Sequence, residues 1–367
     1  MITPTDTRSS ILRYSDLEKQ VWREIHTLSD LRIIKERLKK QAKLDGAALS
    51  DAFATQKAKD IQYCIKQAKD YFVSSKSATL VIKPTLIYYG IISLAAALII
   101  YKNRDKSLNS MKEAHGLKDK YPDSLQNAYS GSVTRNEILK ISAEFQPSGT
   151  FIELKNMNLS EFFTMPIKHN NAADSSKDYL QKLNFSSDNP NLINVDLLTL
   201  FQNIPEIFKE IKLSLNKDSF TYPGEAVISN DSIICRFSNE LCTTEDLKQK
   251  FSFIENATLL ESNNFYFFQL PRATYTSATP LTKRDIIGNQ FLISDINNPF
   301  VSGDFLTYYI TFFILGSLAR YKPALWRIIL EDELHGLNTI PEILCDSSYV
   351  KLPLYFLNEF TNNFYKI

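Results

Sequence analysis

The chain has 367 residues, of which 44% are hydrophobic and 12% aromatic, so it is long enough to bury a large core. Its 42 Lys and Arg residues nearly balance its 41 Asp and Glu residues, which excludes nucleic-acid binding through overall charge. Only 10 glycines are present, and the nucleotide-binding signatures GxGxxG and GxxxxGK[ST] do not occur.

The first part of the chain is predicted to form two helices, over residues 10–45 and 50–76, separated by the turn-forming "LDG" at Leu44 to Gly46. Within the first helix, "LRIIKERLKKQAKL" (residues 31–44) combines a basic surface with one apolar face. That apolar face carries Ile33, Ile34, Leu38 and Ala42.

The basic surface of this helix is the predicted contact site for a protein partner or for nucleic acid, because clustered Lys and Arg attract anions. A solvated helix face with no partner explains the same pattern, and no interleaved aromatic residues support base stacking. The residues predicted to bind are Arg32, Lys35, Arg37, Lys39, Lys40 and Lys43.

The next segment, Pro84 to Tyr101, contains no charged residue and is either a membrane span or a core helix. A helix of this length reaches only about 27 Å, barely the thickness of the hydrocarbon layer. Tyr88 and Tyr89 would lie deep in lipid, away from the interface that tyrosine prefers. The sequence therefore favours a buried helix of a soluble, mainly helical protein, in which no membrane is involved.

The same stretch, "AKDYFVSSKSATLVIKPTLIYYGIISLAAALI" (residues 68–99), resembles the YaaC family of bacterial proteins. "AHG" at Ala114 to Gly116 and "SLARYKPALW" at Ser317 to Trp326 fit that family too. The resemblance covers residues 60–120 and 300–365. It implies a soluble fold with a long buried helix, and it implies no biochemical activity because none is settled for the family.

A second apolar run, "FLTYYITFFILGSLARY" (residues 305–321), echoes the first. Aligning Leu86 with Leu306 without gaps also brings "EAHGL" onto "ELHGL", at Glu113 and Glu333. A duplicated helix–loop–helix would explain the echo, and so would two similarly buried helices. In either case the two runs are expected to pack together, since each is apolar all round.

The middle of the chain is predicted to mix helices and strands. A polar helix is expected over residues 103–120, a β-hairpin over 138–154, and two helices hinged at Pro205 over 193–215. Residues 169–177 are expected to be a surface loop. Strands are predicted at 232–237, 265–270 and 290–295, with a short helix capped by Thr243 or Thr244.

The predicted fold class is mainly α (α+β), with helical N- and C-terminal segments packing together and a β-hairpin and a small β-rich insertion between them. The expected domains are residues 1–125 (helical), 126–218 (hairpin plus helix pair), 219–300 (β-rich) and 301–367 (helical). The polar N-terminus favours a cytoplasmic protein with reduced cysteines. No metal cluster or cofactor is expected.

Two histidines, His115 and His335, each precede Gly-Leu and follow an arginine-bearing segment. Imidazole and guanidinium together can cleave RNA without metal, so the candidate catalytic pairs are Arg104 with His115, and Arg327 or Arg320 with His335. The Arg–His spacing is wider than in HEPN-type ribonucleases. A helix C-cap, with Gly left-handed and His at the negative helix end, is the alternative.

The sequence thus favours a non-enzymatic interaction component, in a stress or phage-defence system, with the basic helix as its contact surface. The alternative function is a metal-independent, HEPN-like ribonuclease that uses the His/Arg pairs. Neither the oligomeric state nor the identity of a partner or substrate follows from the sequence.

Overall fold

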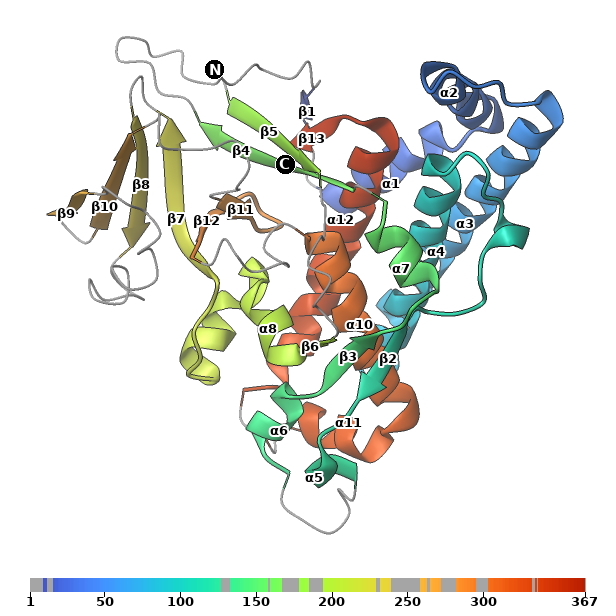
Figure 1. The fold of residues 1–367 in the computed structure, drawn as a ribbon. Helices are drawn as coiled ribbons and strands as arrows, with labels where there is room; N and C mark the ends of the chain where they lie inside the picture. Colours follow the sequence, from blue (N-terminus) through green and yellow to red (C-terminus); the bar gives the residue numbers. More distant parts are fainter. Residues whose placement is uncertain are drawn as a thin grey trace. The chain divides into compact units, whose positions relative to one another are not determined.

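The computed structural model describes residues 9–11, 16–126, 133–157, 159–166, 178–184, 194–228, 232–238, 258–262, 265–271, 282–294, 303–331, 334 and 336–366 (Figure 1). The chain divides into two compact units. Unit 1 consists of residues 1–8, 160–185 and 201–304. Unit 2 consists of residues 9–159, 186–200 and 305–367, so it joins the two ends of the chain.

Unit 2 is mainly helical, as predicted. Its longer helices are α1 (Leu17–Leu28), α2 (Leu31–Leu44), α3 (Asp51–Ser77), α4 (Lys83–Lys102), α10 (Asp304–Tyr321), α11 (Pro323–Leu330) and α12 (Thr339–Thr361). The single helix predicted over residues 10–45 is wrong. It is broken after α1, because the Asp30 carboxylate accepts the Arg32 backbone N–H and starts α2 there.

Helix α4 forms the core of unit 2. Its residues from Ile91 to Ile100 are buried with the exception of the half-buried Ile92. Among the described residues, α4 is the one helix long and apolar enough to cross a membrane, and 72% of its apolar window is buried within the fold. The predicted core helix is confirmed.

The C-terminal end of α4 is held by a fully buried lysine from α3. The Lys57 ammonium donates to four backbone carbonyls, at distances of 2.7, 2.7, 3.1 and 3.0 Å, and these carbonyls belong to Ile100, Asn103, Arg104 and Lys106. The last carbonyls of a helix have no intrahelical hydrogen-bond donor, so the Lys57 side chain supplies the donor for the carbonyls at this helix end. Burial lowers the pKa of Lys57 to about 8.

Helices α4 and α10 pack against each other, which confirms that the two ends of the chain form one helical body. The ring of Tyr88 lies 5.7 Å from the ring of Tyr309 and 5.7 Å from that of Phe313, both in edge contacts. The Thr85 hydroxyl donates to the Gly316 carbonyl at 3.4 Å. The N-terminal half of α4 therefore packs against the middle of α10.

Two predicted elements in unit 2 are wrong. Residues 103–120 form a loop, the 3₁₀ turn η1 (Leu108–Ser110) and strand β2 (Leu117–Lys120) instead of a helix. The second arm of the predicted hairpin is helix α7 (Thr150–Lys155). Strand β3 (Ser142–Phe145) pairs instead with β2 and with β6 (Asn194–Asp196), because neighbours far along the chain complete its ladder.

The remaining elements of unit 2 are short. They are helices α5 (Asp123–Gln126) and α6 (Arg135–Leu139), and strands β1 (Ser9–Ile11) and β13 (Phe364–Lys366), which pair in parallel. Beyond the two apolar helices the secondary structure of the aligned segments differs, although the aligned Gly116 and Gly336 both have positive φ, at +80° and +87°. Residues 323–330 form α11, whereas residues 103–110 contain only η1.

Unit 1 is built on an antiparallel sheet in the order β11-β12-β7-β8-β10-β9. Its strands are β7 (Thr221–Ile228), β8 (Ser232–Ser238), β9 (Thr258–Ser262), β10 (Phe265–Pro271), β11 (Thr282–Arg284) and β12 (Gln290–Ile293). The predicted strands at 232–237, 265–270 and 290–295 are thereby confirmed. The predicted capped helix at Thr243 or Thr244 and the loop 169–177 lie outside the described residues.

The predicted helix pair at 193–215 takes the form of α8 (Leu197–Gln202), the 3₁₀ turn η2 (Pro205–Ile207) and the π turn η3 (Glu210–Ser214). A hairpin of β4 (Ser160–Pro166) and β5 (Asp178–Asn184) also belongs to unit 1. Three cysteines, Cys64, Cys235 and Cys345, are buried free thiols, as predicted, and Cys242 lies outside the described residues.

Candidate anion-binding site

The candidate site lies in unit 2 where α4, α10 and the start of β2 meet, and we call it the aromatic corner. It consists of Tyr88, Tyr89, His115, Tyr121, Arg320, Tyr321 and Lys322. Helix α10 ends at Tyr321 because Pro323 cannot continue it, and this break places Arg320 in the last helical turn.

Arg320 is held in place by two hydrogen bonds and three aromatic rings. Its Nε donates to the Gly316 carbonyl at 3.0 Å and its Nη1 to the Tyr89 hydroxyl at 2.8 Å. Its guanidinium carbon lies 5.8 Å from the ring of Tyr88, 5.4 Å from that of Tyr89 and 5.1 Å from that of Tyr321. No ion pair joins Arg320 to any carboxylate among the described residues. The guanidinium is thus fixed but not neutralised.

His115 reaches the corner through the tight turn before β2. Gly116 has φ +80°, and a Cβ there would lie 3.2 Å from atoms of Phe151 and Ile152, so only glycine fits. The Phe151 N–H donates to the His115 carbonyl at 2.9 Å and fixes the backbone. The imidazole lies 5.5 Å from the ring of Tyr88 and 6.3 Å from that of Phe313, yet the residue is exposed to solvent.

The charge of Arg320 affects the protonation of His115. Partial burial, and then the positive charge of Arg320, lower the pKa of His115 from its ordinary value of 6.5. The positive charge of Arg320 disfavours the protonated imidazole, so His115 is a neutral base at pH 7. An anion bound between them would remove this repulsion.

The ammonium of Lys322 and the hydroxyl of Tyr121 complete the corner. The Lys322 ammonium lies 5.3 Å from the centre of the Tyr121 ring. The Tyr121 hydroxyl is 3.5 Å from the Ser317 hydroxyl, which donates to the Asp119 carboxylate at 2.6 Å. Burial raises the pKa of Tyr121, so its hydroxyl stays protonated, and because Ser317 donates to Asp119 this proton is directed to the Ser317 oxygen. The corner therefore offers two lasting cations and a titratable imidazole.

The structure gives His115 a different arginine from the predicted one. Arg104 is exposed and pairs with the adjacent Asp105 at 3.1 Å, and no described contact joins it to His115. Arg327 is exposed and pairs with Glu331 at 3.4 Å. His335 lies outside the described residues. The helix-cap interpretation is wrong for His115, since no helix ends there, although Gly116 is left-handed as expected.

The basic helix α2 buries Ile34, Leu38 and Ala42, as its pattern predicts. Four of its six basic residues have partners within the chain. Lys35 and Lys39 both bind the Asp51 carboxylate, at 2.7 and 2.5 Å, Arg32 pairs with Asp30, and Arg37 donates to the Phe360 carbonyl. Lys40 and Lys43 are exposed, and neither forms an ion pair with a described residue.

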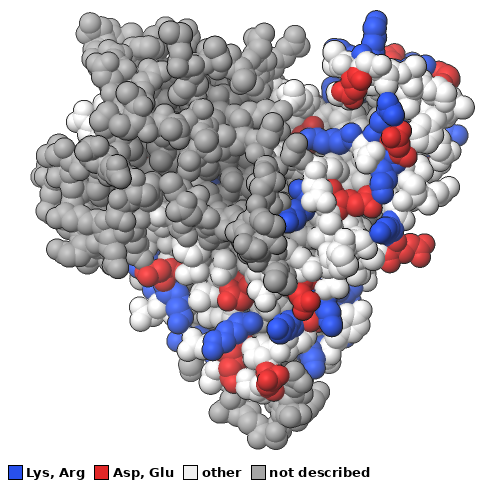
Figure 2. Space-filling view, viewed as in Figure 1, with Lys and Arg blue, Asp and Glu red and all other residues white. Residues whose placement is uncertain are grey.

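Helix α2 and the aromatic corner are distant from each other. Arg37 contacts Phe360, whose ring packs on Tyr101 at the C-terminal end of α4. The corner lies at the N-terminal half of α4, and a 20-residue helix is about 30 Å long. On the face in Figure 2, blue and red side chains are interspersed over the described surface, so local groups and not a broad charged area must provide recognition.

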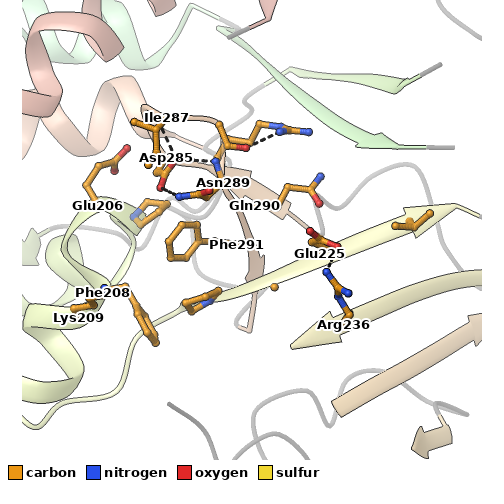
Figure 3. A pocket seen from close by; sticks show the side chains of 16 residues that line it. Glu206, Phe208, Lys209, Glu225, Arg236, Asp285, Ile287, Asn289, Gln290 and Phe291 are labelled. Atoms are coloured by element: carbon orange, nitrogen blue, oxygen red, sulfur yellow. Dashed lines mark hydrogen bonds and ion pairs between the residues drawn. The ribbon is translucent and has the colours of Figure 1, made fainter. Parts of the chain in front are cut away.

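Unit 1 contains a separate pocket of about 810 Å³ between β7, β12 and η2 (Figure 3). Phe208 and Phe291 line it, with ring centres 6.1 Å apart. Its charged groups have partners within the chain: Arg236 pairs with Glu225 at 2.9 Å, and Arg284 donates to the Gly288 carbonyl at 2.7 Å. The pocket thus has volume, but its charges are already matched, and the aromatic corner is the stronger candidate.

Sequence reasoning missed most of the corner. Arg320 was paired with His335 in the prediction, and Tyr121, Tyr321 and Lys322 were not considered. The adjacent letters "ARYK" at Ala319 to Lys322 hold two of the cations and the exposed ring, and are the signal that could have located it. Among the described residues, no group of three or more His, Cys, Asp and Glu is arranged to hold a metal ion.

Comparison with known proteins identifies one relationship. The sequence model of a family described as YaaC-like Protein matches residues 26–360, which is nearly the whole chain. No curated protein and no solved structure matches the chain significantly.

Proposed function

The chain belongs to the YaaC-like protein family, and from this premise we propose that it is a soluble, non-enzymatic interaction component of the bacterial cytoplasm. The proposed role is to bind a phosphate-bearing partner at the aromatic corner. Stress response or phage defence is the setting proposed for this binding, and the genes that neighbour its own are the first place to look for the partner.

One observation carries this proposal: Arg320 and His115 both lie against the ring of Tyr88, and neither forms an ion pair with a carboxylate of a described residue. A guanidinium placed beside a titratable imidazole forms a site that can gain a second positive charge when an anion binds. Guanidinium is the side chain best suited to a phosphate, because its N–H groups match the phosphate oxygens. The Nη2 of Arg320 donates no hydrogen bond to a described residue.

Titration calorimetry with inorganic pyrophosphate tests the proposal. Replacing Lys322 or Arg320 by Gln should weaken binding at least 5-fold each, since a charge-assisted hydrogen bond contributes about 1.5–3 kcal/mol. The matched control is Arg327→Gln, which removes an equal charge from an exposed position of α11. If the native chain does not bind pyrophosphate, or if the control loses as much affinity, the corner is not an anion site.

Helix α2 is proposed as a second contact surface for a protein partner or nucleic acid. Its unpaired residues, Lys40 and Lys43, are the ones able to contact a partner without first breaking an internal pair. Reversing both to Glu should abolish co-purification with the partner, whereas reversing Lys35 and Lys39, which bind Asp51, should act mainly through that internal contact. Unchanged co-purification with the Lys40 and Lys43 variant would remove α2 from the proposal.

A metal-independent ribonuclease is the second candidate function, and the placement of Arg320 and His115 against the same ring, that of Tyr88, is the observation that favours it. A neutral imidazole can take the proton of a 2′-hydroxyl while the guanidinium stabilises the charged phosphate. His115→Ala should then eliminate RNA cleavage that persists in EDTA. Cleavage retained in that variant would end this alternative without affecting anion binding through Arg320.

A further inference from the structure

We infer that the aromatic corner binds a nucleotide with an unpaired base, free or within a single strand, with the phosphate at Arg320 and the base on the ring of Tyr321. This inference rests on the proposed function, because it names the ligand of the same anion site. Binding of this ligand requires no catalysis, and it involves the exposed ring of Tyr321 as well as the phosphate site.

The ring of Tyr321 is the main argument. It is 68% exposed, although it directly follows the guanidinium that a phosphate would bind. The helix break before Pro323 keeps this ring at the surface instead of in the core of unit 2. The guanidinium carbon of Arg320 lies over one face of the ring, 5.1 Å from its centre, so a planar base would stack on the opposite face.

The arrangement matches the way proteins hold single-stranded nucleic acid. Such sites combine cations for the backbone with aromatic rings on which bases stack, and every base has a face that can stack. A base paired in a duplex has no free face, so the inference excludes duplex binding at this ring. A phosphopeptide would use the cations in the same way but would gain nothing from Tyr321.

Three probes separate these cases: adenosine 5′-monophosphate, ribose 5-phosphate, which lacks the base, and a fluorescent single-stranded oligonucleotide with its duplex form as comparison. Base stacking should make the nucleotide bind about 5- to 100-fold more tightly than ribose 5-phosphate. Tyr321→Ala should remove this ratio, because the nucleotide loses its stacking partner whereas any shift of Arg320 affects both probes alike, while Tyr321→Trp should preserve it. Tyr63→Ala, at an exposed ring on α3, is the matched control.

The outcomes distinguish the inference from the proposed function. If both small probes bind with equal affinity in the native chain, or if Tyr321→Ala keeps the ratio, the corner holds phosphate alone and the nucleotide inference is overturned. If neither probe binds, the anion site itself is wrong. Because Tyr321 is largely solvent-exposed, its replacement should leave the fold intact, and an unchanged unfolding transition confirms this.

Discussion

At the scale of single residues, His115 couples the corner to pH. Its pKa in the folded chain lies below the ordinary 6.5, so the folded state binds fewer protons than the unfolded state as the pH falls through this range. The contribution of His115 to stability is therefore complete above pH 6.5 and is lost as the pH falls to its folded pKa. A bound anion has the opposite effect on the pKa of His115: it raises this pKa, because it stabilises the imidazolium.

We therefore expect sulfate, whose charge is constant between pH 7.5 and 5.5, to bind more tightly as the pH falls through this range. The gain should require His115 and disappear in His115→Gln, as measured by titration calorimetry in two buffers of different ionisation enthalpy. His26→Gln, at an exposed histidine of α1, should keep the gain. Affinity that is independent of pH in the native chain would contradict the assignment of His115 to the site.

Lys57 is a second residue with a role that its sequence position does not reveal. Replacing it by Met keeps most of its volume but leaves four carbonyls at the end of α4 without their donor. Buried groups that lose a partner cost about 1–3 kcal/mol each, so we expect a loss of at least ~3 kcal/mol in the free energy of unfolding. Urea denaturation measures it, and Lys59→Met, at an exposed position of α3, should change stability by less than about 0.5 kcal/mol.

At the scale of elements, the contact between α3 and α4 depends on one glycine. A Cβ on Gly90 would lie 2.9 Å from the ring of Phe72, and that ring is itself held by Trp22 and Tyr349. Gly90→Ala should gain about 1 kcal/mol of helix propensity but lose more through overpacking, for a net destabilisation of about 1–2 kcal/mol. Adding Phe72→Leu to Gly90→Ala should recover the lost stability. If Gly90→Ala alone is as stable as the native chain, α3 and α4 can separate slightly to make room for the methyl group.

The sequence predicted elements well where one helix or strand is defined by its own pattern. Helix α4 is apolar all round, α2 has a clear apolar face, and β8, β10 and β12 are rich in aromatic and branched residues. It failed where distant segments decide the outcome. Thr150 and Phe151 become helical because their N–H groups donate to Ala114 and His115, and a short apolar run cannot reveal that contact.

The site was harder to predict than the fold for the same reason. Arg320 lies far from His115 in the sequence, and only the crossing of α4 and α10 brings both to the ring of Tyr88. The sequence pairs His115 with the arginine of the preceding segment, Arg104, whose guanidinium instead pairs with the adjacent Asp105.

At the scale of the whole molecule, the burial of α4 decides how the protein behaves in a cell extract. The chain should remain in the supernatant after ultracentrifugation without detergent, because α3, α10 and α12 cover the apolar surface that a membrane would otherwise cover. Replacing Tyr309 and Phe313 by Ser, which uncovers α4, should shift the protein into the pellet. Quantitative membrane association of the native chain would contradict the core-helix assignment.

Because unit 2 combines segments from both ends of the chain, its parts are synthesised at different times. Helix α4 leaves the ribosome early, but α10 begins about 200 residues later, which is a delay of roughly 10–40 s at 5–20 residues per second. During that interval α3 can already cover part of α4, but the apolar surface of α4 that contacts α10 and α12 stays exposed. Chaperone capture of nascent chains should therefore begin when α4 emerges and end only once α10 has been made.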